Sequence, residues 1–223
     1  MLWVVFNLSR GRRHGRLVLE TVRGVPIVVF PQVFHPSLFL STNLVLDALA
    51  RLRLDTGSSV LDKGTGAGIC AILAAMKGAH VTAVDISPIA VRCAILNVIL
   101  NCQEDRVRVL EGDLFQPIGA QRFDLVIFNP PYYEGEPREW AEHAWRGKNV
   151  VRRFLEGLPS HLTKDGRALL SVSTELDLPT VYEGLRAHGF QLREMRKRKL
   201  PRETMFVYEC ALPTVAKNGQ IPN

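Results

Sequence analysis

The sequence predicts an α/β fold with a mostly parallel sheet, and three observations support this prediction. From residue 59 onward, short runs rich in apolar and β-branched residues alternate with longer segments of helical periodicity. A glycine-rich turn follows the first of these strands, and no helical segment separates the last two. The alternation indicates parallel strands joined by right-handed helical crossovers, and the last pair indicates an antiparallel C-terminal edge.

Seven strands are expected in this sheet, and a smaller β-structure precedes it. The expected strands are 59–62, 80–85, 106–110, 123–128, 167–173, 190–196 and 204–211. The expected helices are 42–54, 67–77, 88–102, 148–163 and 178–188. Short β-rich runs at 3–8, 17–22 and 25–30 predict a hairpin or meander. The chain therefore divides into an N-terminal β extension over 1–32, one α/β domain over 33–212 and a disordered tail over 213–223.

The composition is that of an ordinary globular protein. Hydrophobic residues make up 47% and charged residues 22% of the chain, and no apolar run approaches the roughly 20 residues of a membrane span. The four cysteines form no CxxC pair, which favours free thiols and a reducing, cytoplasmic location. None of the six histidines is spaced with cysteines or acids as a metal site requires, so no metal is expected.

The charge is unevenly distributed, with 28 lysines and arginines against 22 acids. Two basic clusters carry the excess: Arg10, Arg12, Arg13, His14 and Arg16, and then Arg193, Arg196, Lys197, Arg198, Lys199 and Arg202. Such clusters attract polyanions, including RNA and ribosome surfaces. A solvated face and a flexible turn explain them equally well.

The clearest motif runs from Val60 to Gly68 and reads VLDKGTGAG. Gly64, Gly66 and Gly68 lie between a strand and a helix, where glycine permits a tight turn and lets a ligand approach the backbone closely. Sites that hold the diphosphate of a dinucleotide usually have the spacing GxGxxG. The GxGxG spacing and the carboxylate of Asp62, two residues before the first glycine, favour a cationic ligand instead.

Two more acids follow the next two strands. Asp85 ends the second strand, where a carboxylate can accept both hydroxyl groups of a ribose. Asp113 follows the third strand, where it or its neighbouring backbone can meet an adenine amine. Each acid alone is equally typical of a helix N-cap or an exposed strand end. Three acids at successive strand ends, on the edge where open α/β sheets bind ligands, favour a common binding site.

The tetrapeptide Asn129-Pro130-Pro131-Tyr132 directly follows the strand 123–128. The side-chain oxygen of Asn129 and the carbonyl oxygen of Pro130 can each accept a hydrogen bond, and together they can hold both hydrogens of a planar –NH2 group. Tyr132 offers an aromatic face on which a flat amide or base can stack. A proline-rich turn would explain the prolines but not the Asn and Tyr that flank them.

Together these motifs resemble those of class I S-adenosylmethionine-dependent methyltransferases, which have a Rossmann-like fold, and of the members that modify amino nitrogens. Within that class the chain is similar to the HemK-like release-factor glutamine methyltransferases, particularly to their small form, over roughly residues 33–210. The similarity extends past the tetrapeptide into 144–149, 153–155 and 162–166. The resemblance implies S-adenosylmethionine as cofactor and direct attack of a substrate nitrogen on its sulfonium methyl group.

The resemblance also implies roles for individual residues. The three glycines would cradle the cofactor, Asp85 would hold its ribose, and Asp113 or Leu114 would meet its adenine. The whole implied cofactor site consists of Thr42, Asp62, Gly64, Thr65, Gly66, Gly68, Asp85, Ile86, Asp113, Leu114 and Asn129. The implied acceptor site, which orients the target nitrogen, consists of Asn129, Pro130 and Tyr132.

The chain departs from the small form at three places. Lys63 stands inside the glycine motif where an apolar residue is usual, and we expect it to reach outward or to pair with an acid. An acidic pair before a Ser or Thr is replaced by Leu40-Ser41-Thr42-Asn43, in which only Thr42 fits. The first 30 residues have no counterpart and suggest an addition for substrate recognition.

Three functions stay open on the sequence alone. The resemblance favours methylation of a protein glutamine, with a release factor or a ribosome-associated protein as partner. The basic clusters and Tyr132 favour the alternative, an adenine amine in RNA or DNA. Lys63 and the absent acidic pair would suit a non-catalytic binding module, but such a module has no use for the tetrapeptide. The sequence indicates no membrane contact and does not indicate an oligomeric state.

Overall fold

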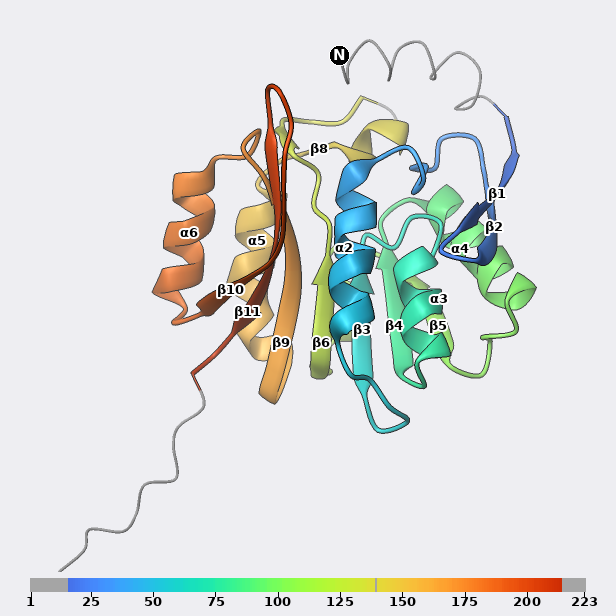
Figure 1. The fold of residues 1–223 in the computed structure, drawn as a ribbon, viewed down its shortest axis with the longest axis horizontal. Helices are drawn as coiled ribbons and strands as arrows, with labels where there is room; N and C mark the ends of the chain where they lie inside the picture. Colours follow the sequence, from blue (N-terminus) through green and yellow to red (C-terminus); the bar gives the residue numbers. More distant parts are fainter. Residues whose placement is uncertain (1–15, 139, 214–223) are drawn as a thin grey trace, which may run out of the picture.

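The computed structural model describes residues 16–138 and 140–213, and a twisted sheet with helices on both faces dominates it (Figure 1). The strand predicted over 3–8, the basic residues Arg10 to His14 and residues 214–223 of the predicted tail lie outside the described residues. The first described element is therefore the second of the β-rich runs that the sequence indicated.

The main sheet has the strand order β10-β11-β9-β6-β3-β4-β5. Neighbouring strands from β9 to β5 run parallel, whereas β11 runs antiparallel to both β9 and β10. The predicted seven-stranded, mostly parallel sheet with an antiparallel C-terminal strand near one edge is confirmed. The strands are β3 (Ser59–Lys63), β4 (His80–Asp85), β5 (Val107–Glu111), β6 (Phe123–Phe128), β9 (Leu162–Ser173), β10 (Gln191–Lys199) and β11 (Thr204–Ala211).

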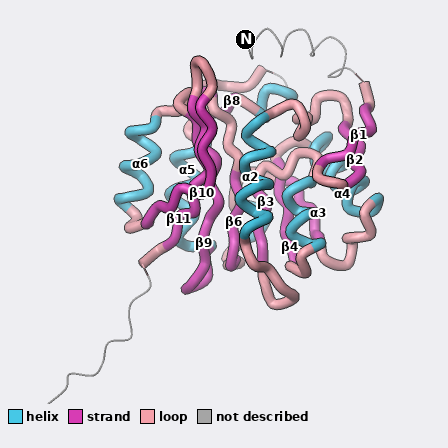
Figure 2. The backbone as a smooth tube through the Cα atoms, viewed as in Figure 1, coloured by secondary structure: helices cyan, strands magenta, loops and turns pink. Residues whose placement is uncertain are grey.

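Helices cover the two faces of this sheet and bury a separate apolar cluster on each (Figure 2). One face carries α2 (Leu40–Arg51), α3 (Ile69–Met76) and α4 (Pro88–Leu100), and the other carries α5 (Val150–Gly157) and α6 (Leu178–Ala187). Val60 and Leu61, adjacent in β3, belong to different clusters because successive side chains of a strand point to opposite faces. The central strands are thereby buried on both sides.

Local sequence signals explain where several helices begin and end. Ser87 caps α4 by accepting a hydrogen bond from the N–H of Ala90, and Pro88 occupies the first turn. The helix predicted over 148–163 ends early at Gly157, and the 3-10 helix η3 (Leu158–His161) follows. Pro159 lies at the start of η3 and has no N–H for a continuing α-helix. As a result β9 begins at Leu162, earlier than the predicted 167.

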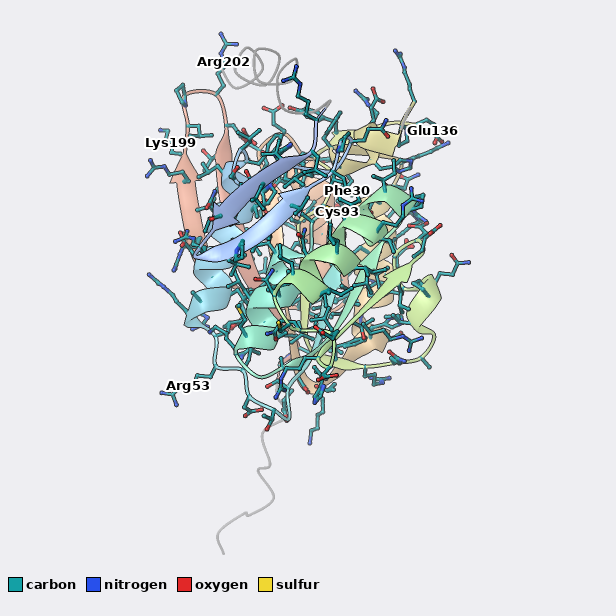
Figure 3. All side chains as sticks on the ribbon, turned by 90° about the vertical axis from the view of Figure 1, so that its right-hand side faces the viewer. Phe30, Arg53, Cys93, Glu136, Lys199 and Arg202 are labelled. Carbon is teal, nitrogen blue, oxygen red and sulfur yellow. The ribbon has the colours of Figure 1, made fainter. Side chains whose placement is uncertain are left out.

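An N-terminal hairpin packs on α4. Its strands β1 (Val18–Val22) and β2 (Val25–Val29) are antiparallel and connected by two residues with positive φ, Arg23 and Gly24. The buried side chain of Asn97 exchanges two hydrogen bonds of 2.7 Å with the backbone of Val28. Figure 3 shows Phe30, just after β2, beside Cys93 of α4. The hairpin therefore shares the core of the α/β domain.

The segment between β6 and α5 passes over the carboxyl ends of the central strands. It contains β7 (Tyr133–Glu134), the 3-10 helix η2 (Trp140–Ala144) and β8 (Arg146–Gly147), and β7 pairs with β8 in parallel. A further 3-10 helix, η1 (Gln116–Ile118), follows β5. Among the described residues no helix is both long and apolar enough to cross a membrane.

Candidate active site

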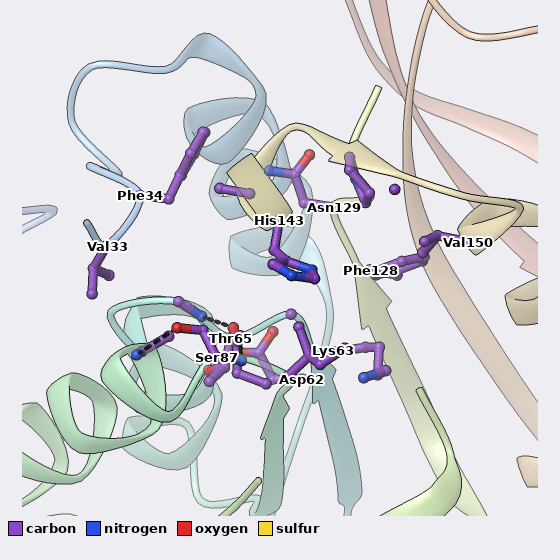
Figure 4. A pocket seen from close by; sticks show the side chains of 18 of the residues that line it. Val33, Phe34, Asp62, Lys63, Thr65, Ser87, Phe128, Asn129, His143 and Val150 are labelled. Atoms are coloured by element: carbon purple, nitrogen blue, oxygen red, sulfur yellow. Dashed lines mark hydrogen bonds between the residues drawn. The ribbon is translucent and has the colours of Figure 1, made fainter. Parts of the chain in front are cut away.

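A cavity of about 320 Å³ lies at the carboxyl ends of β3, β4 and β6 (Figure 4). This volume is in the range of small-molecule sites. Most of the residues predicted for the cofactor line this one cavity, namely Thr42, Asp62, Gly64, Thr65, Gly66, Asp85, Ile86, Asp113, Leu114 and Asn129. Gly68, Pro130 and Tyr132 were also predicted for the site and do not line the cavity.

The glycine loop turns sharply between β3 and α3. Gly64 and Gly66 have φ of +64° and +57°, a conformation that costs other residues strain, and the N–H of Gly64 donates to the Val84 carbonyl over 2.8 Å. A Cβ at Gly66 would meet no heavy atom within 4 Å, so its backbone is open to the cavity. A Cβ at Gly68 would lie 3.3 Å from Ala94, so this glycine permits close packing of α3 on α4.

Asp62 holds the glycine loop from inside. Its Oδ2 accepts hydrogen bonds from the Thr65 hydroxyl group over 2.6 Å and from the Ala71 N–H over 3.1 Å. Burial raises the pKa of Asp62 to about 7, and these two hydrogen bonds oppose the rise. The residue predicted to meet a cationic ligand thus also ties the loop to the first turn of α3.

Asp85 connects the glycine loop to the turn after β4. Its two oxygens accept from the backbone N–H groups of Gly66 and Ser87, each over 2.9 Å. Burial raises its pKa, and both hydrogen bonds oppose the rise. Each carboxylate oxygen keeps a second lone pair, so the side chain can still accept two hydroxyl groups.

Asp113 is paired with a residue of α5. Its Oδ2 lies 2.5 Å from Nη1 of Arg153, and both side chains are partly exposed at the rim. The sequence analysis expected Asp113 to meet an adenine amine and did not anticipate this ion pair. Leu114, next to it, has a φ of +44°, so the backbone that follows β5 turns unusually at the cavity.

Asn129 is held on both sides of its amide group. Its Nδ2 donates to the Ser41 hydroxyl group over 3.3 Å, and its Oδ1 accepts from the Tyr132 hydroxyl group over 3.0 Å. The Tyr132 oxygen also lies 2.6 Å from Oγ of Ser171 in β9. Burial raises the pKa of Tyr132, so the phenol stays protonated as a donor.

Tyr132 therefore occupies a different place from the one predicted. Its side chain packs against the apolar cluster on the face of α2, and its hydroxyl group supports Asn129. Residue 132 also borders a neighbouring cavity between the acceptor loop (129–132), α5 and α6. Pro130 is buried beneath the loop. Of the predicted acceptor residues, Asn129 alone faces the cavity that the glycine loop lines.

The expectation that Lys63 reaches outward or pairs with an acid is wrong. Lys63 is only 4% exposed and lines the cavity. Its position at the end of β3 points it to the face opposite Asp62, toward Phe128 and Val150 (Figure 4). No described acid lies within ion-pairing distance of its ammonium group.

Several lining residues were not anticipated from the sequence. Phe34, which stacks on Phe39 with ring centroids 3.9 Å apart, closes the cavity from the segment before α2. His143 of η2 closes it from above (Figure 4). Neither lies in a motif with a recognisable spacing. The described residues contain no group of three or more His, Cys, Asp or Glu side chains that could hold a metal ion.

Comparisons with known proteins agree with this architecture. A ribosomal protein uL3 glutamine methyltransferase of Bradyrhizobium diazoefficiens is 35% identical over 178 residues, which cover 70% of this chain and 56% of that protein. A putative protein N5-glutamine methyltransferase of Methanocaldococcus jannaschii is 29% identical over 203 residues, which cover 86% of this chain and 97% of that protein. The chain thus spans little more than half the length of the first relative.

A solved structure shows the same fold. The T. thermophilus 16S rRNA N2 G1207 methyltransferase superposes with a TM-score of 0.69 at 20% identity, over 89% of this chain and 50% of that one. The model of the methyltransferase small domain family matches residues 27–199. The expected Rossmann-like fold and the resemblance to glutamine methyltransferases are therefore confirmed. This chain belongs to the methyltransferase small domain family.

Proposed function

We propose that this chain is an S-adenosylmethionine-dependent N-methyltransferase that methylates a glutamine side chain of a protein. One observation carries the proposal: the glycine loop and Asn129 line the same cavity. A methyl donor at the loop and a planar nitrogen at Asn129 would meet there, and such positioning can contribute roughly 7–11 kcal/mol to a transfer reaction. The proposal includes a release factor or a ribosome-associated protein as partner, and the cytoplasmic location predicted from the cysteines.

The cavity fits the methyl donor chemically. The open backbone at Gly66 leaves room for close approach, and the free lone pairs of Asp85 suit the two ribose hydroxyl groups. The carboxylates of Asp62 and Asp85 suit a positively charged ligand rather than a diphosphate. When bound, S-adenosylmethionine supplies a methyl group on a positively charged sulfur. Thr42, Thr65, Ile86 and Leu114 would complete its site.

Asn129 would orient the acceptor nitrogen. Because its Nδ2 donates to Ser41, its Oδ1 is left to accept, and Tyr132 uses only one of the two lone pairs of that oxygen. The second lone pair can accept an N–H of a substrate amide. The Pro130 carbonyl group, next in the chain but outside the lining of this cavity, would accept the other N–H from an amide that lies over Asn129. Two such hydrogen bonds polarise the N–H bonds and thereby raise the electron density on a poorly nucleophilic nitrogen. The nitrogen would gain the methyl group as the sulfur–methyl bond breaks, S-adenosylhomocysteine would leave as a neutral thioether, and the nitrogen would release one proton to solvent.

The surface beside the acceptor loop favours a protein substrate. A second cavity of about 680 Å³ shares Pro131, Gly147 and Val150 with the first one. Its carboxylates outnumber its single arginine, Arg152, and belong to Glu134, Glu156, Glu175, Asp177 and Glu183. A polyanion would be repelled there, whereas a neutral or basic protein segment would not. The names of both curated relatives refer to protein glutamine.

The alternative substrate, an adenine amine in nucleic acid, rests on the basic cluster of β10. Part of this cluster is engaged within the molecule: Arg193 pairs with Glu209 over 3.0 Å, and Arg196 donates to the Asp47 carbonyl over 2.7 Å. Lys197 lies over the ring of Phe206. Lys199 and Arg202 extend from the tip of the β10–β11 hairpin (Figure 3). Among the described residues this leaves a small basic tip rather than a continuous nucleic-acid track; the basic residues Arg10 to His14 lie outside them.

The test is transfer of a labelled methyl group from S-adenosylmethionine in a lysate. We expect label in protein that survives RNase and DNase and is recovered as N5-methylglutamine after digestion. Label lost on nuclease treatment would instead establish the nucleic-acid alternative. Asn129→Ala should lower turnover by about 100-fold or more while calorimetry shows that cofactor binding survives. The matched control is Asn43→Ala, since Asn43 bonds only the Phe39 carbonyl of its own helix and should keep full activity.

A further inference from the structure

Lys63 is a buried lysine without a hydrogen bond or an ion pair to any described residue. Its side chain is 4% exposed, and it lines the cavity proposed for the cofactor. Within the described parts of the chain, no oxygen lies within hydrogen-bonding distance of its ammonium group. Its nitrogen is not one of the fully enclosed polar atoms that lack a partner, so the ammonium group faces the open cavity, where a ligand can accept from it.

Another lysine shows how this fold satisfies such a group when its role is structural. Lys77, after α3, donates to the Ala50 carbonyl over 2.9 Å and to the Leu52 carbonyl over 2.6 Å. Those bonds tie the end of α3 to the end of α2, so they explain the position of the Lys77 ammonium group without a ligand. Lys63 has no comparable bonds, so hydrogen bonds within the described chain do not explain why it is buried.

The neighbouring acids do not require Lys63 either. Asp62 accepts from Thr65 and Ala71, and Asp85 accepts from two backbone N–H groups. Asp113 is paired with Arg153. Each acid is therefore satisfied by another part of the chain, although their charges still stabilise the protonated lysine from a distance.

We propose that the Lys63 ammonium group is a positioning residue that donates hydrogen bonds to the nucleoside part of the cofactor. The acceptor atoms in its reach would be ring nitrogens of the adenine or oxygens of the ribose, since Lys63 shares the cavity with Asp85 and Asp113. An apolar side chain at this position could fill the space but could not donate. The inference rests on the proposed function, because it assumes that this cavity holds the cofactor.

A pH dependence follows from the burial of Lys63. Burial lowers its pKa to about 8 in the free protein. A ligand that accepts from the charged form must raise this pKa, so binding takes up protons near pH 8 and weakens as the pH rises further. The other charged and titratable groups of the cavity are Asp62, Cys70, Asp85, Asp113, Glu136, His143, Arg146, Lys148 and Arg153. Comparison with a variant that lacks only Lys63 separates its contribution from theirs.

The experiment uses 5′-methylthioadenosine, which carries adenine and ribose but no amino or carboxylate group that titrates near pH 8. Its affinity is measured by calorimetry between about pH 7 and about pH 9.5 for the wild type and for Lys63→Met. We expect the variant to bind roughly tenfold more weakly at pH 7, the usual loss for one charged hydrogen bond. We expect the wild-type affinity to fall above pH 8 and the variant to show a flatter profile. Lys77→Met is the matched control and should bind like the wild type.

A second measurement needs no variant. Calorimetry of the wild type in buffers of different ionisation enthalpy counts the protons taken up on binding, and we expect up to about half a proton at pH 8.

Equal affinity and equal pH profiles for wild type and Lys63→Met would overturn this inference while leaving the proposed function intact. If Lys63→Met does not fold, binding by the wild type without proton uptake overturns it. Failure of the wild type to bind either 5′-methylthioadenosine or S-adenosylhomocysteine would overturn the proposed function first, and this inference with it.

Discussion

The hydroxyl group of Tyr132 donates a hydrogen bond to Oδ1 of Asn129 over 3.0 Å, and so fixes the amide that faces the cavity. Ser171, on the adjacent strand β9, anchors the same hydroxyl group over 2.6 Å. Since Tyr132 does not line this cavity, we propose that it acts on Asn129 and does not stack on a substrate there. This relationship assigns Tyr132 a supporting role: it sets which atom of Asn129 accepts and where that atom lies.

Removing only the hydroxyl group tests that role. In Tyr132→Phe the ring still packs, but the Asn129 amide can rotate, so we expect kcat to fall roughly tenfold, or about 1.4 kcal/mol in the barrier. Cofactor affinity should not change, because Tyr132 does not line the cofactor cavity. Tyr182→Phe is the control, since it also loses a hydroxyl contact of 3.0 Å, to Tyr208, but far from the loop. An unchanged kcat in Tyr132→Phe would show that Asn129 needs no such support.

The local features of this site could be predicted from the sequence because short-range physics determines them. The alternate glycines permit the positive φ that a tight turn between strand and helix needs, and a carboxylate that ends a parallel strand must lie at the carboxyl edge of the sheet. Gly64, Asp85 and Asn129 line one cavity for these reasons. The strand order near the edge followed from the absence of a helix between the last two strands.

Features that depend on distant packing could not be predicted in this way. The ion pair of Asp113 and Arg153 joins residues 40 positions apart and depends on where α5 crosses the sheet. The sequence suggests that Lys63 reaches the outer surface or an acid, but its strand is covered on both faces, so its side chain borders the cavity instead. The end of α5 is different, because it could have been predicted locally: Pro159 lacks the N–H that a continuing α-helix needs, so the helix ends before it.

Gly66 and Gly68 of the loop should differ in what they lose on substitution, because only Gly66 has open space where a Cβ would lie. Gly66→Ala and Gly68→Ala both place a side chain at positive φ, which costs roughly 1–2 kcal/mol of folding free energy. The new methyl group of Gly66→Ala enters the cavity, so cofactor affinity should also fall, whereas that of Gly68→Ala presses on Ala94 and should add to the loss of stability. Urea denaturation and calorimetry measure the two quantities separately. Equal affinities in both variants would contradict the placement of Gly66 against the cofactor.

The docking of the hairpin on α4 should depend on Asn97. Its buried amide satisfies the N–H and C=O groups of Val28 and the carbonyl group of Ala67, so Asn97→Ala strands buried polar groups. We expect a loss of about 2–3 kcal/mol in the free energy of unfolding. Asn101→Ala is the control, because Asn101 also bonds a hairpin carbonyl, that of Pro26, but at an exposed site. Similar losses in both variants would mean that burial does not decide the effect.

Asp62 should make the protein more stable in mild acid than above neutral pH. Its pKa is raised by burial from 3.8 in the unfolded chain to about 7 in the folded one, so the folded state binds the proton more tightly between these values. The stability that this group contributes is fully present below the unfolded pKa and is lost as the pH rises through about 7. Above that pH the folded protein carries a buried charge at full cost.

The variant Asp62→Asn isolates this effect, because its amide oxygen can still accept from Thr65 and Ala71 but does not titrate in this range. We subtract the free energy of unfolding of the wild type from that of the variant. We expect this difference to increase between about pH 4 and about pH 7, by at most about 1.4 kcal/mol per pH unit. Above about pH 7 it should stay constant. Asp47→Asn serves as the control, since it makes the same chemical change at an exposed partner of Arg23. Parallel stability curves for wild type and Asp62→Asn would mean that the carboxyl group ionises before pH 4 in the folded protein. In that case its hydrogen bonds, and not its burial, would dominate its charge state, and Asp62 would present a full negative charge to the cavity at every pH at which the protein acts.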